Sequence, residues 1–172
     1  MPNQTDPHHA VWTLLESVCD PEIPVVSLRE MGVLRAISAD AQGLAVVITP
    51  TYSGCPAMSQ IHDDVVLALK GSGIDGRVVT KLSPAWSSDW ITAEGKAKLK
   101  AYGIAPPHAC ASEAGSQVVF MNKHLMAQSA VVQCPQCESF NTTETSRFGS
   151  TACKAMFRCL DCSEPFDYFK PY

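Results

Sequence analysis

Long hydrophobic runs are lacking in this sequence. The longest apolar stretches, "GLAVVITP" and "DVVLALK", are far shorter than the roughly 20 residues that a transmembrane helix needs. The N-terminus, "MPNQTDPHHAVW", also lacks a basic segment followed by an apolar core, which is the pattern of a secretory signal. We therefore expect a cytoplasmic protein, in which thiols stay reduced.

Positive charge is also scarce. The chain of 172 residues carries 13 Lys and Arg against 17 Asp and Glu, a formal net charge of −4. Proteins that bind nucleic acid normally present a basic surface to the phosphates. We therefore expect no nucleic-acid partner.

Several sequence motifs of enzymes are missing. The sequence has no Gly-rich phosphate loop, no nucleophile elbow, no His-Glu zinc helix and no dinucleotide fingerprint. Internal repeats and low-complexity tracts are lacking as well. We therefore predict that the protein is not an enzyme in its own right.

The sequence does have eight cysteines, four of them in two closely spaced pairs. "CPQC" supplies Cys134 and Cys137, and "CLDC" supplies Cys159 and Cys162, with 21 residues between the pairs. Two thiolates separated by two residues can bind one ion, and two such turns complete a tetrahedral site. The spacing resembles that of zinc ribbons, and we predict a structural zinc ion. Four thiolates also suit a rubredoxin-type iron or an iron-sulfur cluster, and four unrelated thiols are the remaining alternative.

A four-thiolate site is closed and has no open position for a substrate. We expect the segment around it to be a docking module that a metal stabilises, because so few residues cannot form a sufficient core alone. Residues 134–172 contain four Lys or Arg against five acidic residues, which argues against nucleic-acid binding. Cys153 lies outside the two pairs, and we interpret it as a small buried hydrophobe.

The first part of the chain alternates helical and strand patterns. These patterns predict helices over 10–20, 55–73 and 92–103, and strands over 32–38, 44–51 and 75–83. The order α-β-β-α-β-α predicts an α+β fold, with a small two-layer domain of helices on a three-stranded sheet. We place this domain at residues 7–105, a linker rich in Pro, Ala, Ser and Gly at 106–129, and a zinc ribbon at 130–172.

A lone cysteine, Cys55, lies in "TPTYSGCPA", where a predicted strand ends and a predicted helix begins. Pro56 is typical of the first helical position, and the unpaired N–H groups at a helix start stabilise an anion. On this placement the pKa of the Cys55 thiol should be lowered. A buried structural cysteine is the alternative, and the residues alone favour it, because free Cys is among the most buried residue types.

Two other stretches could converge on Cys55. "DPEIP" offers Asp20 and Glu22 as ligands or acid-base groups, although Asp before Pro is also an ordinary turn former. "SPAWSSDW" follows the third predicted strand, and core packing is the simplest role for Trp86 and Trp90. Local spacing places no general base near Cys55, which disfavours a thiol-dependent enzyme.

In combination, the motifs resemble those of the PaaD (PaaJ) family of phenylacetate-degradation proteins. The resemblance spans nearly the whole chain and is carried, in order, by "DPEIPVVSLREMGVL", "VITPTYSGCPA", "LSPAWSSDWIT", "GIAPP", "CPQC", "FGSTACKA" and "CLDC". The first domain is similar to the wider metal-sulfur cluster assembly family, which includes bacterial SufT and shares the Asp-Pro-Glu turn and the Cys-Pro motif.

This resemblance implies an accessory factor that matures or maintains the iron and iron-sulfur centres of the phenylacetyl-CoA epoxidase, a multicomponent oxygenase of aerobic phenylacetate catabolism. The implied partners are the epoxidase components, above all the reductase with its flavin and [2Fe-2S] cluster, and a homodimer is compatible with the family. A subunit that only bridges the oxygenase and the reductase is the alternative.

The resemblance also implies site residues and cofactors. It assigns a transient contact with a metal or a client protein to Cys55 and to Asp20 and Glu22 of the Asp-Pro-Glu turn. The implied cofactors are structural zinc and transiently held iron or an iron-sulfur cluster. The ribbon ligands that it implies are Cys134, Cys137, Cys159 and Cys162.

Overall fold

A computed structural model describes residues 7–107 and 132–172 of the chain. Contacts divide the chain into two compact units, Met1–Tyr102 with Tyr172, and Gly103–Pro171. The predicted α+β class is confirmed, with three α-helices and a C-terminal four-cysteine cluster among the described residues. Residues 108–129 of the expected linker lie outside the described residues, so the domain boundaries stay a prediction. No helix in the described part of the chain is long and apolar enough to cross a membrane.

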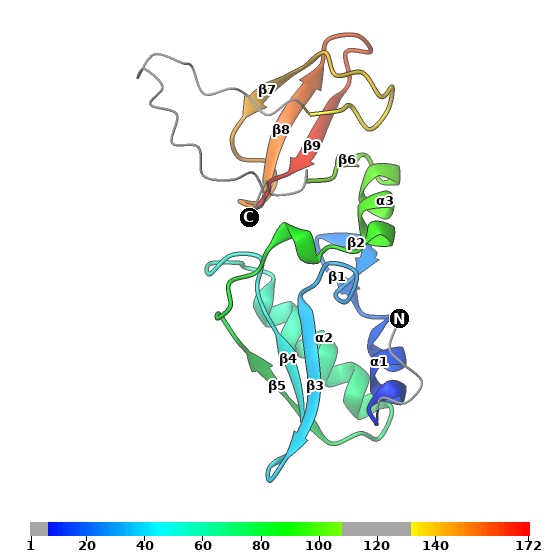
Figure 1. Cartoon of the computed structure of the whole chain (residues 1–172), viewed down its shortest axis with the longest axis vertical. Coiled ribbons are helices and arrows are strands. Elements are labelled where there is room, and N and C mark those ends of the chain that lie inside the picture. Colours follow the sequence, from blue (N-terminus) through cyan, green and yellow to red (C-terminus); the bar gives the residue numbers. More distant parts are fainter. Residues whose placement is uncertain (1–6, 108–131) are drawn as a thin grey trace, which may run out of the picture. The chain divides into compact units, whose positions relative to one another are not determined.

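A three-stranded sheet with one long helix forms the centre of the first unit (Figure 1). β3 (Leu34–Asp40) and β4 (Gly43–Ile48) form an antiparallel hairpin, and β5 (Gly76–Thr80) lies parallel to β4. A parallel pair requires a crossover, which α2 (Met58–Gly71) supplies. The helix buries one apolar stripe, formed by Ile61, Val65 and Leu69. The predicted sheet and its central helix are therefore confirmed.

The N-terminal helix is shorter than predicted. α1 (His9–Leu15) ends before Cys19, and the chain then forms a small antiparallel pair from β1 (Cys19–Asp20) and β2 (Ile23–Ser27), which the sequence analysis missed. Asp20 makes the turn between them, because its Oδ1 accepts hydrogen bonds from the backbone N–H groups of Glu22 at 2.8 Å and Ile23 at 3.1 Å. The interpretation of Asp20 as a turn former is thus confirmed.

α3 (Ala93–Ala101) has the two ends that the sequence predicts. The side chain of Thr92 accepts a hydrogen bond from the backbone N–H of Gly95 at 3.0 Å, which caps the first turn. Gly103 follows the last turn with a φ of +91°, a left-handed conformation that glycine adopts without strain. Before this helix, Trp86 is buried and its Nε1 donates to the backbone oxygen of Met31 at 3.0 Å, so its predicted role in core packing is confirmed.

Replacement of Thr92 by Ala should lower the free energy of unfolding of the protein by about 1 kcal/mol, because one backbone N–H at the start of α3 loses its partner. Urea denaturation of the wild type and the variant measures this difference. Thr13→Ala is the matched control, since the Thr13 hydroxyl only bonds to His9 O on the exposed side of α1. Equal losses in both variants would contradict the capping role of Thr92.

The second unit is a small sheet in the order β6-β9-β8-β7. β7 (Thr142–Ser146), β8 (Lys154–Cys159) and β9 (Pro165–Phe169) are antiparallel neighbours, and β6 (Ile104–Ala105) lies parallel to β9. Alternate side chains of β8 point into the core, as a strand with one buried face requires. The core of this unit consists of Ala105, Val132, Cys134, Ala155, Phe157, Cys159, Phe166 and Tyr168. Two of the predicted metal ligands are therefore core residues.

Candidate functional site

The four paired cysteines converge in the second unit. All four Sγ atoms lie within 4.8 Å of one another. The sulfur atoms of Cys134 and Cys162 are 3.8 Å apart, and those of Cys137 and Cys159 are 3.5 Å apart. A tetrahedral zinc ion with Zn–S bonds of about 2.3 Å places its sulfur ligands roughly 3.8 Å apart. The cluster therefore has the donor set and the spacing to hold one metal ion.

Two similar turns build this cluster. In the first, Cys134 N–H donates to Ser139 O at 2.8 Å, and in the second, Cys159 N–H donates to Glu164 O at 2.9 Å. The residue after the second cysteine of each pair has a positive φ, 63° at Glu138 and 66° at Ser163. The same backbone geometry thus turns each pair of thiols toward one point, although neither position is a glycine.

The protonation of the cluster favours a cation at its centre. The backbone N–H of Cys162 lowers the pKa of the Cys159 thiol to about 7. A backbone N–H from Glu164 stabilises the Cys162 thiolate, but burial and the three other sulfurs outweigh it and raise the pKa of Cys162 to about 12. Four crowded thiols resist joint ionisation, and a bound cation removes that penalty.

Cys55 lies in the loop between β4 and α2, three residues before the helix begins. α2 starts at Met58, so the prediction that Pro56 occupies the first helical position is wrong. The loop forms turns of its own: Cys55 N–H donates to Tyr52 O at 3.2 Å, and Met58 N–H donates to Cys55 O at 3.4 Å. Cys55 therefore precedes the helix, although the N–H of Ala57, the N-cap residue of α2, still hydrogen-bonds its thiolate.

The pKa of the Cys55 thiol is raised, and the predicted lowering is wrong. Burial has the largest effect, and the negative charges of Glu22 and Asp20 raise the pKa further. Hydrogen bonds from the Ala57 N–H and the Thr51 hydroxyl to the thiolate oppose this without cancelling it. Cys55 is therefore a half-buried thiol that stays protonated near neutral pH.

Asp20 and Glu22 therefore lie within electrostatic range of the Cys55 thiol. Thr51 and Ala57 were not predicted as site residues, because their contacts with the sulfur depend on how the loop folds. The same loop borders a cavity of about 270 Å³. Its lining residues are Pro50, Thr51, Tyr52, Ser53, Leu82, Ala85, Trp86 and Tyr172. The "SPAWSSDW" stretch therefore borders the Cys55 loop through its first half.

The remaining sequence candidates have structural roles. The ring of Trp90 lies under the guanidinium group of Arg35, 3.5 Å from its carbon to the ring centroid. Cys153 is buried, with its sulfur 2.9 Å from the Thr151 hydroxyl, which confirms the interpretation as a buried residue.

The comparisons with known proteins follow the division into two units. Residues 121–170 match the family described as "PaaD zinc beta ribbon domain", and residues 8–82 match the family described as "Iron-sulfur cluster assembly protein". Over 165 residues the chain is 42% identical to one subunit of the "Putative 1,2-phenylacetyl-CoA epoxidase" of Escherichia coli (strain K12), with 94% of this chain and 92% of the relative covered. The chain belongs to the PaaD family.

Two shorter relatives resemble only part of this PaaD-family chain. A "Fe-S protein maturation auxiliary factor" of Porphyromonas gingivalis is 30% identical over 89 residues, which cover 50% of this chain and 84% of the relative. The crystal structure of a DUF59 domain from Bacillus anthracis is 27% identical, with a TM-score of 0.49, and covers 54% of this chain and 90% of that chain. The predicted PaaD resemblance, with an iron-sulfur assembly domain and a zinc ribbon, is thus confirmed by the matching families and the Escherichia coli relative.

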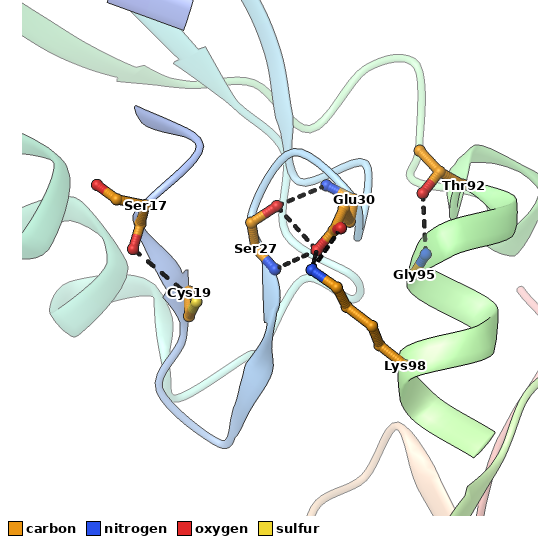
Figure 2. Close-up of polar contacts among 7 residues, drawn as sticks. All are labelled: Ser17, Cys19, Ser27, Glu30, Thr92, Gly95 and Lys98. Carbon is orange, nitrogen blue, oxygen red and sulfur yellow. Dashed lines mark hydrogen bonds and ion pairs between the residues drawn. The ribbon is translucent and has the colours of Figure 1, made fainter. Parts of the chain in front are cut away.

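The PaaD-family chain also has a polar cluster that the sequence analysis did not anticipate (Figure 2). Glu30 accepts hydrogen bonds from the Ser27 N–H at 2.9 Å and from Lys98 Nζ at 2.9 Å. Burial opposes ionisation, but these contacts lower the pKa of Glu30 overall. They join the end of β2 to α3 beside a hollow of about 440 Å³. Because Glu30 and Lys98 neutralise each other's charge, we interpret the cluster as a structural link between the end of β2 and α3.

Proposed function

We propose that this protein is an accessory factor that matures or maintains the iron and iron-sulfur centres of a phenylacetyl-CoA epoxidase and has no turnover of its own. Two relatives support the proposal by name, one as a component of that epoxidase and one as an auxiliary factor of Fe-S protein maturation. We call the epoxidase component that receives the metal centre the client. The reductase with its [2Fe-2S] cluster is the client that we favour.

The observation that carries this proposal is the grouping of Cys55 with two carboxylates in the domain that matches the assembly family. Negative charge from Asp20 and Glu22 disfavours a free thiolate but attracts a cation. An iron ion next to the sulfur reverses the penalty, since a thiol that coordinates a metal is deprotonated. The site therefore suits brief contact with incoming iron or a cluster better than nucleophilic attack.

The ribbon has a separate role in this proposal. Cys134, Cys137, Cys159 and Cys162 hold one zinc ion, which folds the second unit and leaves no position open for chemistry. The second unit then serves to dock the client. Metal analysis of the purified protein tests the choice of ion: one zinc per chain is expected, whereas red, iron-bearing protein would contradict it.

Replacement of Cys55 by Ser tests the site. The variant is co-expressed with the epoxidase components, and the cluster content of the reductase and the iron content of the oxygenase are measured. We expect a loss of several-fold in client loading, because the hydroxyl of serine is a far weaker ligand for iron than a thiolate. Cys19→Ser is the matched control, since Cys19 is also a partly exposed thiol of the first unit. If the epoxidase components co-expressed with Cys55→Ser contained as much cluster and iron as those co-expressed with the wild type, Cys55 would have no role in loading.

A subunit that bridges the oxygenase and the reductase without metal transfer is the second candidate. The raised pKa of Cys55 favours it, because a thiol held protonated is what a merely packed cysteine would show. This candidate predicts a stable stoichiometric complex on size-exclusion chromatography. It also predicts that the client co-expressed with Cys55→Ser contains as much metal as the client co-expressed with the wild type. The maturation factor predicts reduced loading with that variant.

A further inference from the structure

Two large apolar side chains are exposed where the metal-binding turns meet. Phe140 follows the first turn with 59% of its surface exposed, and Leu160 lies inside the second with 55% exposed. Their backbones are adjacent, because Leu160 N–H donates to Asn141 O at 2.8 Å and Thr142 pairs with Cys159 in the sheet. We call Phe140 and Leu160 the knuckle patch.

The backbone under the knuckle patch is held in place. Asp161 accepts hydrogen bonds from the hydroxyl of Ser139 and from Asn141 Nδ2, the latter at 2.7 Å, which ties the two turns together. The patch is thus presented on a rigid base. Fixed apolar anchors of this kind lose little conformational entropy when a partner binds.

The charges around the knuckle patch are mainly negative. Glu138, Asp161 and Glu164 lie in or next to the two turns and are exposed. Among the described residues, Arg158 is a cation next to the second turn, and its Nε donates to Ser163 O at 3.4 Å. An apolar pair within an acidic rim complements a surface of the opposite pattern.

We propose that the knuckle patch docks a protein partner that presents apolar side chains bordered by lysines and arginines. The acidic rim steers and selects this partner, and Phe140 and Leu160 provide the buried contact. The identity of the partner, the reductase component of the epoxidase, rests on the proposed function. The chemistry that the partner must present is inferred from the surface of the ribbon alone.

The ribbon also offers a matched control for this surface. Phe148 is as exposed as the patch residues, at 65%, but it lies in the connection between β7 and β8. β7 begins beside Cys159 and ends at Ser146, so Phe148 is at the end of the sheet opposite the metal-binding turns. A general loss of surface hydrophobicity would affect both sites, whereas a specific docking surface would not.

The test measures binding of the purified reductase to the full-length protein by calorimetry or surface plasmon resonance at two salt concentrations. We expect the double variant Phe140→Ser/Leu160→Ser to bind about tenfold more weakly or worse, and Phe148→Ser to bind within twofold of the wild type. Zinc content and size-exclusion volume confirm that each variant is folded.

A charge variant tests the acidic rim independently of the apolar pair. Glu164→Lys should weaken binding severalfold, more strongly at low salt than at high salt. Asp75→Lys makes the same charge change on an exposed residue of the first unit and should have no comparable effect. If both variants weakened binding of the reductase equally, the acidic rim would have no specific role in docking.

The remaining outcomes separate this surface from the proposed function. If the double variant Phe140→Ser/Leu160→Ser bound the reductase as tightly as the wild type does, the knuckle patch would not be the docking surface, and the proposed function would be unaffected. Absence of any binding by the wild-type protein would overturn the proposed partner and the patch with it. Loss of a homodimer in the double variant, with binding of the reductase retained, would show that a second copy covers the patch and would also overturn the proposal.

Discussion

Replacement of Cys159 by Ser should unfold the second unit, Gly103–Pro171, and leave the first unit folded. Cys159 is fully buried, joins β8 to the second metal-binding turn and belongs to the four-sulfur cluster. Structural zinc contributes roughly 10 to 16 kcal/mol to the folding of small zinc domains, whereas a core of this size contributes only a few kcal/mol. With zinc bound as proposed, loss of one of the four ligands weakens metal binding and with it the main contribution to the stability of this unit.

Hydrogen exchange measured by mass spectrometry checks this result. Peptides from β7, β8 and β9 should lose their protection in Cys159→Ser, and peptides from β3, β4 and α2 should keep it. Removal of the metal with a strong chelator should have the same effect on the wild type. Cys153→Ser is the matched control, because Cys153 is also buried in this unit but is not part of the cluster. Retention of the metal and of full protection by Cys159→Ser would contradict a structural metal site.

The ribbon was predictable because its signal is local in the chain. Cys134 and Cys137 are separated by two residues, and this spacing alone brings two sulfurs to one ion in almost any backbone context. The positive φ at Glu138 and Ser163 was not predictable, since neither residue type is typical of that conformation. A metal ion held by the four sulfurs would constrain what local propensity does not specify.

The helices and the main sheet were predictable for a similar reason. The spacing of Ile61, Val65 and Leu69 fixes the buried face of α2, and this periodicity persists whatever the helix packs against. The pair β1–β2 was missed because two of the residues involved, Cys19 and Asp20, form a strand only through the side-chain turn at Asp20. A pattern of two residues carries too little periodicity to be recognised.

The environment of Cys55 could not be read from its neighbours in the sequence. The helix starts at Met58 rather than at Pro56, and the N–H of its N-cap residue Ala57 stabilises the thiolate without cancelling the opposing effects. The charges of Asp20 and Glu22, which raise the pKa together with burial, come from a turn more than 30 residues away in the chain. The direction of the pKa shift of Cys55 therefore depends on the tertiary structure, and the neighbouring sequence predicted the wrong direction.

Replacement of Glu22 by Gln should have opposite effects on the reactivity of Cys55 and on its capacity to receive iron. The carboxylate of Glu22 raises the pKa of Cys55, so its removal lowers that pKa and increases the thiolate fraction at a given pH. Alkylation of Cys55 by iodoacetamide should then become faster and reach half of its maximal rate at a lower pH than in the wild type. Glu22 is a better choice than Asp20, because Oδ1 of Asp20 also holds the turn between β1 and β2.

Loading of the client should nevertheless fall severalfold in Glu22→Gln, because the same charge that suppresses the thiolate attracts the metal cation. The two readouts separate the rival functions, since a merely packed cysteine would show the faster alkylation with no change in loading. Glu94→Gln is the control, because it removes one exposed carboxylate of the first unit that is not among the charges acting on Cys55. A variant that alkylates faster and still loads the reductase as the wild type does would therefore exclude a metal role for Glu22 and favour the bridging subunit.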